Sequence, residues 1–191
     1  MGAAGDMLMA ALYELCSQAD RAKFLADMNA LLPGVEVRPQ AARRQGIAGT
    51  HMSVLVHGRE EGEPHGHDHD HHHGHEHLHG HEHDHDHGHS HTHQHRSLAD
   101  VLAVIDGFSL PAEIRERAKA VYALIAQAES RAHGVPVGEV HFHEVGALDA
   151  VADVTGVCYL AHLLAPDEVA CSPVAVGSGT VRTAHGLLPV P

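Results

Sequence analysis

Two segments of the sequence carry side chains that bind metal ions. The first places 17 histidines and six Asp or Glu within the 31 residues 65–95, with Leu78 as the only large apolar side chain. Most free imidazoles are neutral near pH 7, because their pKa is about 6.5, so a nitrogen lone pair is available to a metal. Mixed imidazole and carboxylate ligands favour nickel, copper and zinc over magnesium and calcium. This segment therefore predicts a reservoir for a divalent transition metal.

Residues 65–95 alternate histidine with polar or small residues and contain almost no apolar side chain that a core could bury. Ordering the backbone costs about 1–2 kcal/mol per residue, so we expect a disordered internal loop. An expression tag would be contiguous and terminal, whereas a solubilising low-complexity insert without a ligand role remains an alternative. The histidines expected to hold ions are His67, His69, His71, His73, His75, His77, His79, His81, His83, His85, His87 and His89.

The second segment reads HFHEVGALDAVAD and combines imidazoles with carboxylates. His141 and His143 point to the same side of an extended stretch, because the strand period is two. Asp149 and Asp153 are four residues apart and share a face of the helix expected next. Gly146 permits a sharp turn that brings the two pairs together. The spacing therefore predicts a nitrogen and oxygen ligand set suited to an octahedral divalent ion.

Glu144 adds a further carboxylate to this second segment, and each residue also has a simpler explanation. Asp149 suits the first turn of a helix, where the dipole favours acids. Asp153 is equally compatible with a solvated helix face, and His141 with a strand surface. HxHE followed by DxxxD is more specific than a lone histidine, but it is not a standard zinc motif such as HExxH.

Three weaker features stand outside these segments. Gly5 and Asp6 belong to a glycine-rich helix start, where backbone N–H groups can bind a phosphate; such starts are also common without a ligand. His185 is a candidate ligand on a loop, although an exposed histidine explains it equally well. Arg43 and Arg44 either clamp an anionic substrate or belong to a solvated hairpin.

Apolar spacing and capping residues predict the elements that position these side chains. Helices and strands mix without regular βαβ alternation, so both α+β and α/β classes fit. We expect one domain built from residues 1–64 and 97–191, interrupted by the metal-binding insert 65–96. Helices are expected near 6–19, 20–32, 97–105, 111–134 and 147–164, and strands near 35–37, 52–56, 140–145 and 169–176.

Composition excludes several classes of protein. The net charge is −13 with only two lysines, which argues against a nucleic-acid surface and a polybasic membrane footprint. No signal peptide or run of 18 apolar residues occurs, so a cytoplasmic protein is expected. The GxxxxGK[ST] motif of P-loop GTPases is absent. Few aromatics predict an aliphatic interior, with Cys16 and Cys158 as core thiols.

Several motifs together resemble the LarC nickel-insertion family: GAAGDM, RRQGIAGT, AESRAHG, EVHFHEVGALDAVADVTG and SPVAVGSGTVRTAHGLLPVP. The resemblance runs nearly the length of the chain, and its most specific parts are EVHFHEVGALD and GSGTVRTAHGLLPVP. Family members usually begin with a further short strand and continue into a C-terminal domain. We therefore expect this chain to be the N-terminal portion of such a protein, truncated at the C-terminus.

The resemblance implies a CTP-dependent cyclometallase, a lyase that inserts nickel into pyridinium-3,5-bisthiocarboxylic acid mononucleotide. The product is the nickel-pincer cofactor of lactate racemase-type enzymes, so hand-over to such an apoenzyme is expected. CTP with Mg²⁺ or Mn²⁺ is expected to bind the C-terminal domain, so this portion alone is expected to be inactive. The sequence leaves the oligomeric state open, a homo-oligomer included.

Within the resemblance, nickel is expected to pass from the reservoir to His141, His143, Glu144, Asp149 and Asp153. Asp6 and His185 are expected neighbours. Forming a nickel–carbon bond also requires a base for the displaced ring proton. Glu144 and His143 are both candidates. The main alternative function is a nickel or zinc storage protein or metallochaperone without catalysis.

Overall fold

The computed structural model describes residues 4–60, 96–142, 145–174, 176–183 and 186–190. The histidine-rich segment, His143, Glu144 and His185 lie outside these residues, and their roles remain predictions. The helices are α1 (Gly5–Leu15), α2 (Gln18–Leu31), α3 (Leu98–Asp106), α4 (Ala112–His133), α5 (Leu148–Leu164) and the short 3-10 helix Val137–Glu139. The strands are β1 (Val35–Arg44), β2 (Ile47–Val56), β3 (Arg59–Glu60), β4 (Arg96–Ser97), β5 (His141–Phe142), β6 (Gly179–Thr183) and β7 (Gly186–Val190).

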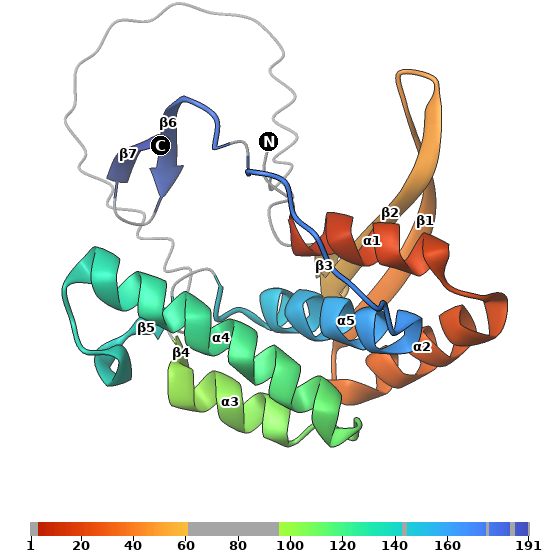
Figure 1. Ribbon diagram of the computed structural model, residues 1–191, viewed down its shortest axis with the longest axis horizontal. Coiled ribbons are helices and arrows are strands. Elements are labelled where there is room, and N and C mark those ends of the chain that lie inside the picture. Colours follow the sequence, from red (N-terminus) through yellow and green to blue (C-terminus); the bar gives the residue numbers. More distant parts are fainter. Residues whose placement is uncertain (1–3, 61–95, 143–144, 175, 184–185, 191) are drawn as a thin grey trace, which may run out of the picture.

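The strands form three small antiparallel sheets, ordered β1-β2-β3, β4-β5 and β6-β7. This arrangement confirms the mixed class predicted from the sequence and favours α+β, because no strand pair described here is parallel. Helix α5 lies at the centre, with α1, α2 and the β1–β2 hairpin on one side and α3 and α4 on the other (Figure 1). No helix in the described ranges is long and apolar enough to cross a membrane.

The buried core is mostly aliphatic, as the composition predicted, although its largest fully buried side chains are aromatic. These are Tyr122, Tyr159, Phe24 and Phe142. Small residues let the helices approach closely. A Cβ added at Gly156 of α5, for example, would lie 2.5 Å from Met9 Sδ. Cys16 and Cys158 are buried thiols, as predicted.

Local capping confirms most predicted helix limits. Ser97 and Asp100 form a reciprocal capping box at the start of α3. Gly134 ends α4 in the left-handed conformation, with φ 67°. The N-cap of α1 is Ala4, which makes no side-chain capping hydrogen bond, although Asp6 has the residue type that favours this position. Asp6 lies in the first turn instead, where the helix dipole favours an acid.

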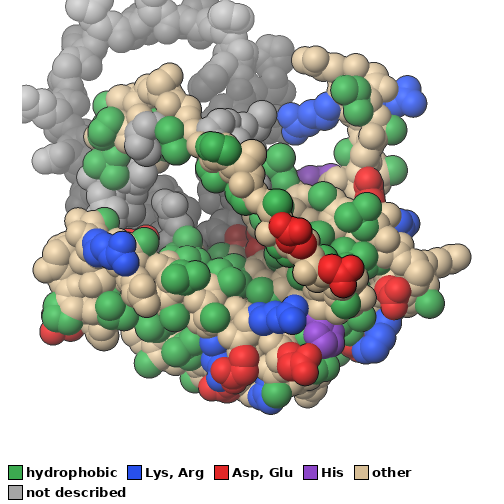
Figure 2. Space-filling model, viewed as in Figure 1, with side chains coloured by type: hydrophobic (Ala, Val, Ile, Leu, Met, Phe, Trp, Pro, Cys, Tyr) green, Lys and Arg blue, Asp and Glu red, His purple; other side chains and the backbone are tan. Residues whose placement is uncertain are grey.

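The predicted antiparallel hairpin is confirmed and is longer than expected. Strands β1 and β2 pair from Val35↔Val56 to Arg44↔Ile47. Gln45 and Gly46 have φ of 49° and 86°, as the two-residue turn between twisted strands requires. Only the half nearest the helices packs into the core, so the distal half projects from the body with basic side chains near its end (Figures 1 and 2).

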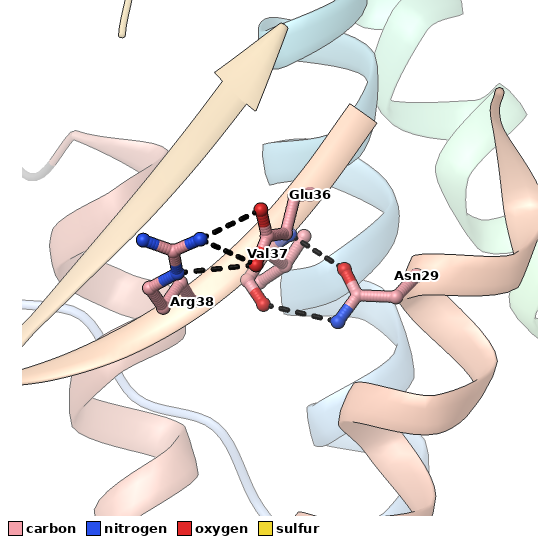
Figure 3. Close-up of polar contacts among 4 residues, drawn as sticks. All are labelled: Asn29, Glu36, Val37 and Arg38. Atoms are coloured by element: carbon pink, nitrogen blue, oxygen red, sulfur yellow. Dashed lines mark hydrogen bonds and ion pairs between the residues drawn. The ribbon is translucent and has the colours of Figure 1, made fainter. Parts of the chain in front are cut away.

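Helix α2 is joined to β1 by the side chain of Asn29. Its Nδ2 donates to the Val37 carbonyl at 3.2 Å, and its Oδ1 accepts from the Val37 N–H at 2.6 Å (Figure 3). The amide thus occupies the backbone hydrogen-bonding groups that β1 presents on its unpaired edge. On the same strand, Arg38 and Glu36 form an exposed ion pair at 2.8 Å.

The strand predicted near 169–176 is not formed. Residues 165–174 and 176–178 contain neither helix nor strand. Val169 and Val174 are 83% and 65% exposed, so their β-branched side chains have no neighbouring strand or core to pack against. The strand in this region begins later, at Gly179, and pairs with β7. Of the extended stretch predicted near 140–145, His141 and Phe142 form β5, which pairs with β4, and residues 143–144 lie outside the described residues.

Candidate functional site

The candidate site begins with two aspartates near the start of α5. Asp149 lies in the first turn and Asp153 one turn later, so both carboxylates project from the same helix face. Asp149 Oδ1 and Asp153 Oδ1 are buried, and neither has a hydrogen-bond partner among the described residues. Buried carboxylate oxygens without donors are costly. Their presence therefore indicates a site kept for binding rather than for stability.

The start of α1 packs directly against Asp153. A Cβ added at Gly5 would lie 2.7 Å from Asp153 Cβ and 2.8 Å from Oδ2, so only glycine permits this approach. The backbone N–H of Asp6 donates to the Asp153 carboxylate. Gly5 and Asp6, predicted to bind a phosphate, therefore lie beside carboxylates, and this acidic neighbourhood disfavours an anion.

The three aspartates line one cavity of about 270 Å³. Asp6 reaches it from α1, and Asp149 and Asp153 reach it from α5. The wall opposite the helices comes from the sheet and consists of His51, Met52, Val54 and Glu60. In the part of the chain that the structure describes, the lining contains four carboxylates and one imidazole but no Lys or Arg. A cavity of this composition attracts cations and supplies both oxygen and nitrogen donors.

Burial and neighbouring acids change the protonation of this cavity. Desolvation, followed by the charges of Asp6 and Asp149, raises the pKa of Asp153 to about 7, although the Asp6 N–H opposes the change. The Asp153 carboxyl can therefore exchange a proton near neutral pH. Burial, with the charges of Asp149 and Asp153, also raises the pKa of Tyr122 well above its usual range.

Two hydrogen bonds hold the turn that leads into α5. The Tyr122 hydroxyl donates to the Val145 carbonyl at 2.9 Å, and Arg96 Nη1 donates to the Gly146 carbonyl at 2.8 Å. The predicted turn at Gly146 is present, but close packing, rather than backbone freedom, explains why a glycine occupies it. A Cβ there would lie 2.8 Å from Phe142 Cβ.

His141 lies apart from the cavity lining. It is exposed on β5, opposite Ser97 in the β4–β5 pair. It acts on Asp100, the acid of the α3 capping box, whose pKa is lowered mainly by hydrogen bonds from the Ser97 side chain and backbone and also by the charges of Arg96 and His141. The structure thus brings together Asp6, Asp149 and Asp153 but not His141. Within the described residues, no group of three or more His, Cys, Asp or Glu is arranged to hold a metal ion.

Sequence reasoning missed His51 and Glu60. Both flank the segment expected to be the second strand of the hairpin, and Glu60 comes directly before the stretch leading to the histidine-rich residues. Continuing the strand period backwards from Met52 would have placed His51 in the sheet. Local spacing does not predict which helix face packs against the sheet, so it could not place these two residues beside the aspartates.

A cavity lined by acids and an imidazole, set between two helix starts and a small sheet, favours positively charged ligands over anions. The chain belongs to the nickel insertion protein family, whose model matches residues 1–191. This result confirms the resemblance seen in the motifs.

Among similar proteins, the pyridinium-3,5-bisthiocarboxylic acid mononucleotide nickel insertion protein of Lactiplantibacillus plantarum is 40% identical over the whole chain, which covers 42% of that protein. A Geotalea daltonii protein named for nickel insertion is 35% identical over the whole chain, which covers 40% of it. The chain thus spans about two-fifths of the length of these relatives. No solved structure matches the chain.

Proposed function

We propose that this chain is the metal-handling part of a protein that inserts nickel into pyridinium-3,5-bisthiocarboxylic acid mononucleotide. The relative from Lactiplantibacillus plantarum bears that name. The structural observation that carries the proposal is the convergence of Asp6, Asp149 and Asp153 on one cavity, with two buried carboxylate oxygens that lack donors. These oxygens suit a divalent ion held as a substrate.

In this proposal, Asp149 and Asp153 bind nickel together with His143 and Glu144, which stand in the sequence shortly before α5. His141 and His185 remain candidate ligands from neighbouring segments. Weak, exchangeable nitrogen and oxygen ligands let the ion leave for the pincer ring. Closing the nickel–carbon bond displaces a ring proton, and Glu144, His143 or Asp153 accepts it. Without a bound ion the pKa of Asp153 is about 7, so this carboxyl can take up a proton only once nickel has left it for the ring.

The wider reaction involves parts outside this chain. CTP with Mg²⁺ or Mn²⁺ would bind the remaining three-fifths of a full-length protein, as in a cyclometallase of the lyase class. The nickel-pincer cofactor would then pass to a lactate racemase-type apoenzyme in the cytoplasm. We expect this chain by itself to be inactive.

Replacing His143 tests the ligand assignment. In a full-length protein containing this chain, His143→Ala should abolish nickel insertion when substrate, Ni²⁺ and CTP are supplied, with unchanged circular dichroism. His133→Ala, which changes a histidine near the end of α4, is the matched control and should insert nickel normally. Normal insertion by His143→Ala would refute the assignment.

A storage protein or metallochaperone is the competing function, and the histidine-rich segment supports it equally. Deleting residues 65–95 separates the two. If the folded cavity binds nickel, one tight ion remains in the deleted protein, and insertion continues at saturating nickel. If the chain only stores metal, equilibrium dialysis finds no tight ion after the deletion.

A further inference from the structure

His51 and Glu60 form a pair at the exposed rim of the acidic cavity. His51 lies on β2 and Glu60 on β3, and these strands pair antiparallel. His51 Nε2 lies 4.0 Å from Glu60 Oε1, and the side chains are 46% and 30% exposed. Both residues line the same cavity as the three aspartates. They therefore offer solvent-accessible donors on the cavity that the carboxylates of α5 also line.

A buried hydroxyl fixes the orientation of the His51 ring. Ser53 is only 2% exposed, and its Oγ lies 3.3 Å from His51 Nδ1. In the tautomer that carries its proton on Nδ1, the ring donates to Ser53 and presents the Nε2 lone pair toward Glu60. Histidines that bind metals are usually held in this way through their second ring nitrogen.

We propose that His51 and Glu60 are a two-ligand transfer site for a divalent transition metal ion at the rim of the cavity. Metal bonds to imidazole nitrogen and carboxylate oxygen are about 2.0–2.2 Å long, so opposite ligands of one ion lie about 4.2 Å apart and adjacent ligands about 3 Å apart. The separation of 4.0 Å between Nε2 and Oε1 lies between these values, and rotation of the partly exposed Glu60 side chain brings the two donors to either. Water fills the remaining positions, so the ion exchanges readily toward Asp149 and Asp153.

The surroundings distinguish this pair from other histidine–glutamate pairs. His133 Nε2 lies 3.1 Å from Glu129 Oε2 on α4, within hydrogen-bond distance, and that pair does not line the acidic cavity. The His51–Glu60 separation of 4.0 Å is too long for a hydrogen bond, and both residues line the cavity that contains the unpartnered Asp149 and Asp153 oxygens. A hydrogen-bonded ion pair therefore does not account for the arrangement at the rim.

The test uses the full chain with the 17 histidines of residues 65–95 replaced by asparagine, which removes the competing ligands. Zn²⁺ is added to about two equivalents, enough to occupy both the aspartate site and the rim pair, and the histidine side-chain ¹⁵N resonances are followed by NMR. The Nε2 resonance of His51 should shift, and that of His133 should not. Ni²⁺ affinity is measured on the same protein by calorimetry.

His51→Gln and Glu60→Gln should each weaken the weaker of the two Ni²⁺ binding events, the one at the rim, at least about tenfold, and Ser53→Ala should weaken it by about the same factor. His133→Gln, the matched control, should leave affinity unchanged. An unshifted His51 resonance, or affinity unchanged in both rim variants, would overturn the transfer site. Circular dichroism checks that each variant is folded.

This inference rests on the proposed function only in taking nickel as the natural ion. The titrations contain no pyridinium substrate, so their failure would remove the transfer site and leave nickel insertion untouched. Conversely, a shifted His51 resonance combined with normal insertion by His143→Ala would keep the transfer site and refute the ligand assignment.

Discussion

Two aspartates, Asp153 on α5 and Asp27 on the neighbouring α2, show opposite uses of a carboxylate. Asp27 of α2 accepts hydrogen bonds from Lys23 Nζ, at 2.5 Å, and from the hydroxyl of Tyr159 on α5. Asp153 accepts one hydrogen bond from a backbone N–H and faces the charges of Asp6 and Asp149. Both carboxylates are partly removed from water, but only Asp27 has cationic and hydroxyl donors.

The pKa values follow from these partners. Burial alone would raise the pKa of Asp27, but the hydrogen bonds from Lys23 and Tyr159 outweigh it and hold the pKa below its usual value. Burial and like charges raise the pKa of Asp153 to about 7. Asp27 therefore stabilises the fold as an anion, whereas an ionised Asp153 destabilises it. Such a cost is typical of a functional residue.

The largest expected effect comes from exchanging each aspartate for asparagine in a full-length protein. Asp153→Asn should lower the rate of nickel insertion by more than about 100-fold, because it removes a ligand charge and a proton acceptor. Asp27→Asn should retain most of the insertion rate, because Asp27 does not line the cavity. Product formation at saturating Ni²⁺ measures both rates. An equal loss of insertion rate in both variants would show that Asp153 has no functional role that Asp27 lacks.

The pH dependence of stability should also have opposite signs. A raised pKa gives stability that is complete below the unfolded value, near 3.8, and lost as pH rises through about 7. At pH 8, Asp153→Asn should therefore raise the unfolding midpoint, by roughly 4–8 °C if the relief is about 2 kcal/mol after allowing for remaining exposure. The gain should shrink as pH falls toward 4.

Asp27→Asn supplies the opposite sign in the same experiment. A lowered pKa gives stability that is present above the unfolded value and lost as pH falls through the folded value. The variant should therefore melt below the unchanged protein at pH 8 and approach it in acid. Melting is followed by circular dichroism with a chelator present, because a bound cation would stabilise ionised Asp153. A lower midpoint for Asp153→Asn at pH 8 would contradict the raised pKa.

Local sequence was enough to predict most elements, because helix caps and strand alternation are local. Ser97 with Asp100 marked the start of α3, and Gly134 marked the end of α4. The strand near 169–176 failed because β-branched residues favour a strand only where another strand or a core receives them. Val174 is instead 65% exposed.

The candidate site could be predicted only in part. The spacing of Asp149 and Asp153 placed both on one helix face, which the structure confirms. Their meeting with Asp6, 143 residues away from Asp149 along the chain (149 − 6), depends on how α1 packs against α5. The packing of two helices and a sheet decided which residues share the cavity, and no local pattern contains that information. His51 and Glu60 were missed for this reason.

The smallest expected effect is on stability and concerns uncharged hydrogen-bond partners at the edge of β1. Asn29 joins α2 to the Val37 backbone through two hydrogen bonds in a partly buried setting (Figure 3). Asn29→Ala should lower the free energy of unfolding by about 1 kcal/mol, or roughly 2–4 °C, because it leaves a backbone donor and acceptor of Val37 without their partner. The neighbouring Glu36 is a matched control, since its ion pair with Arg38 is about half exposed on both sides. Glu36→Gln should change the unfolding free energy by less than about 0.5 kcal/mol in a urea titration. An equal loss in both variants would mean that burial does not decide which polar contacts stabilise this fold.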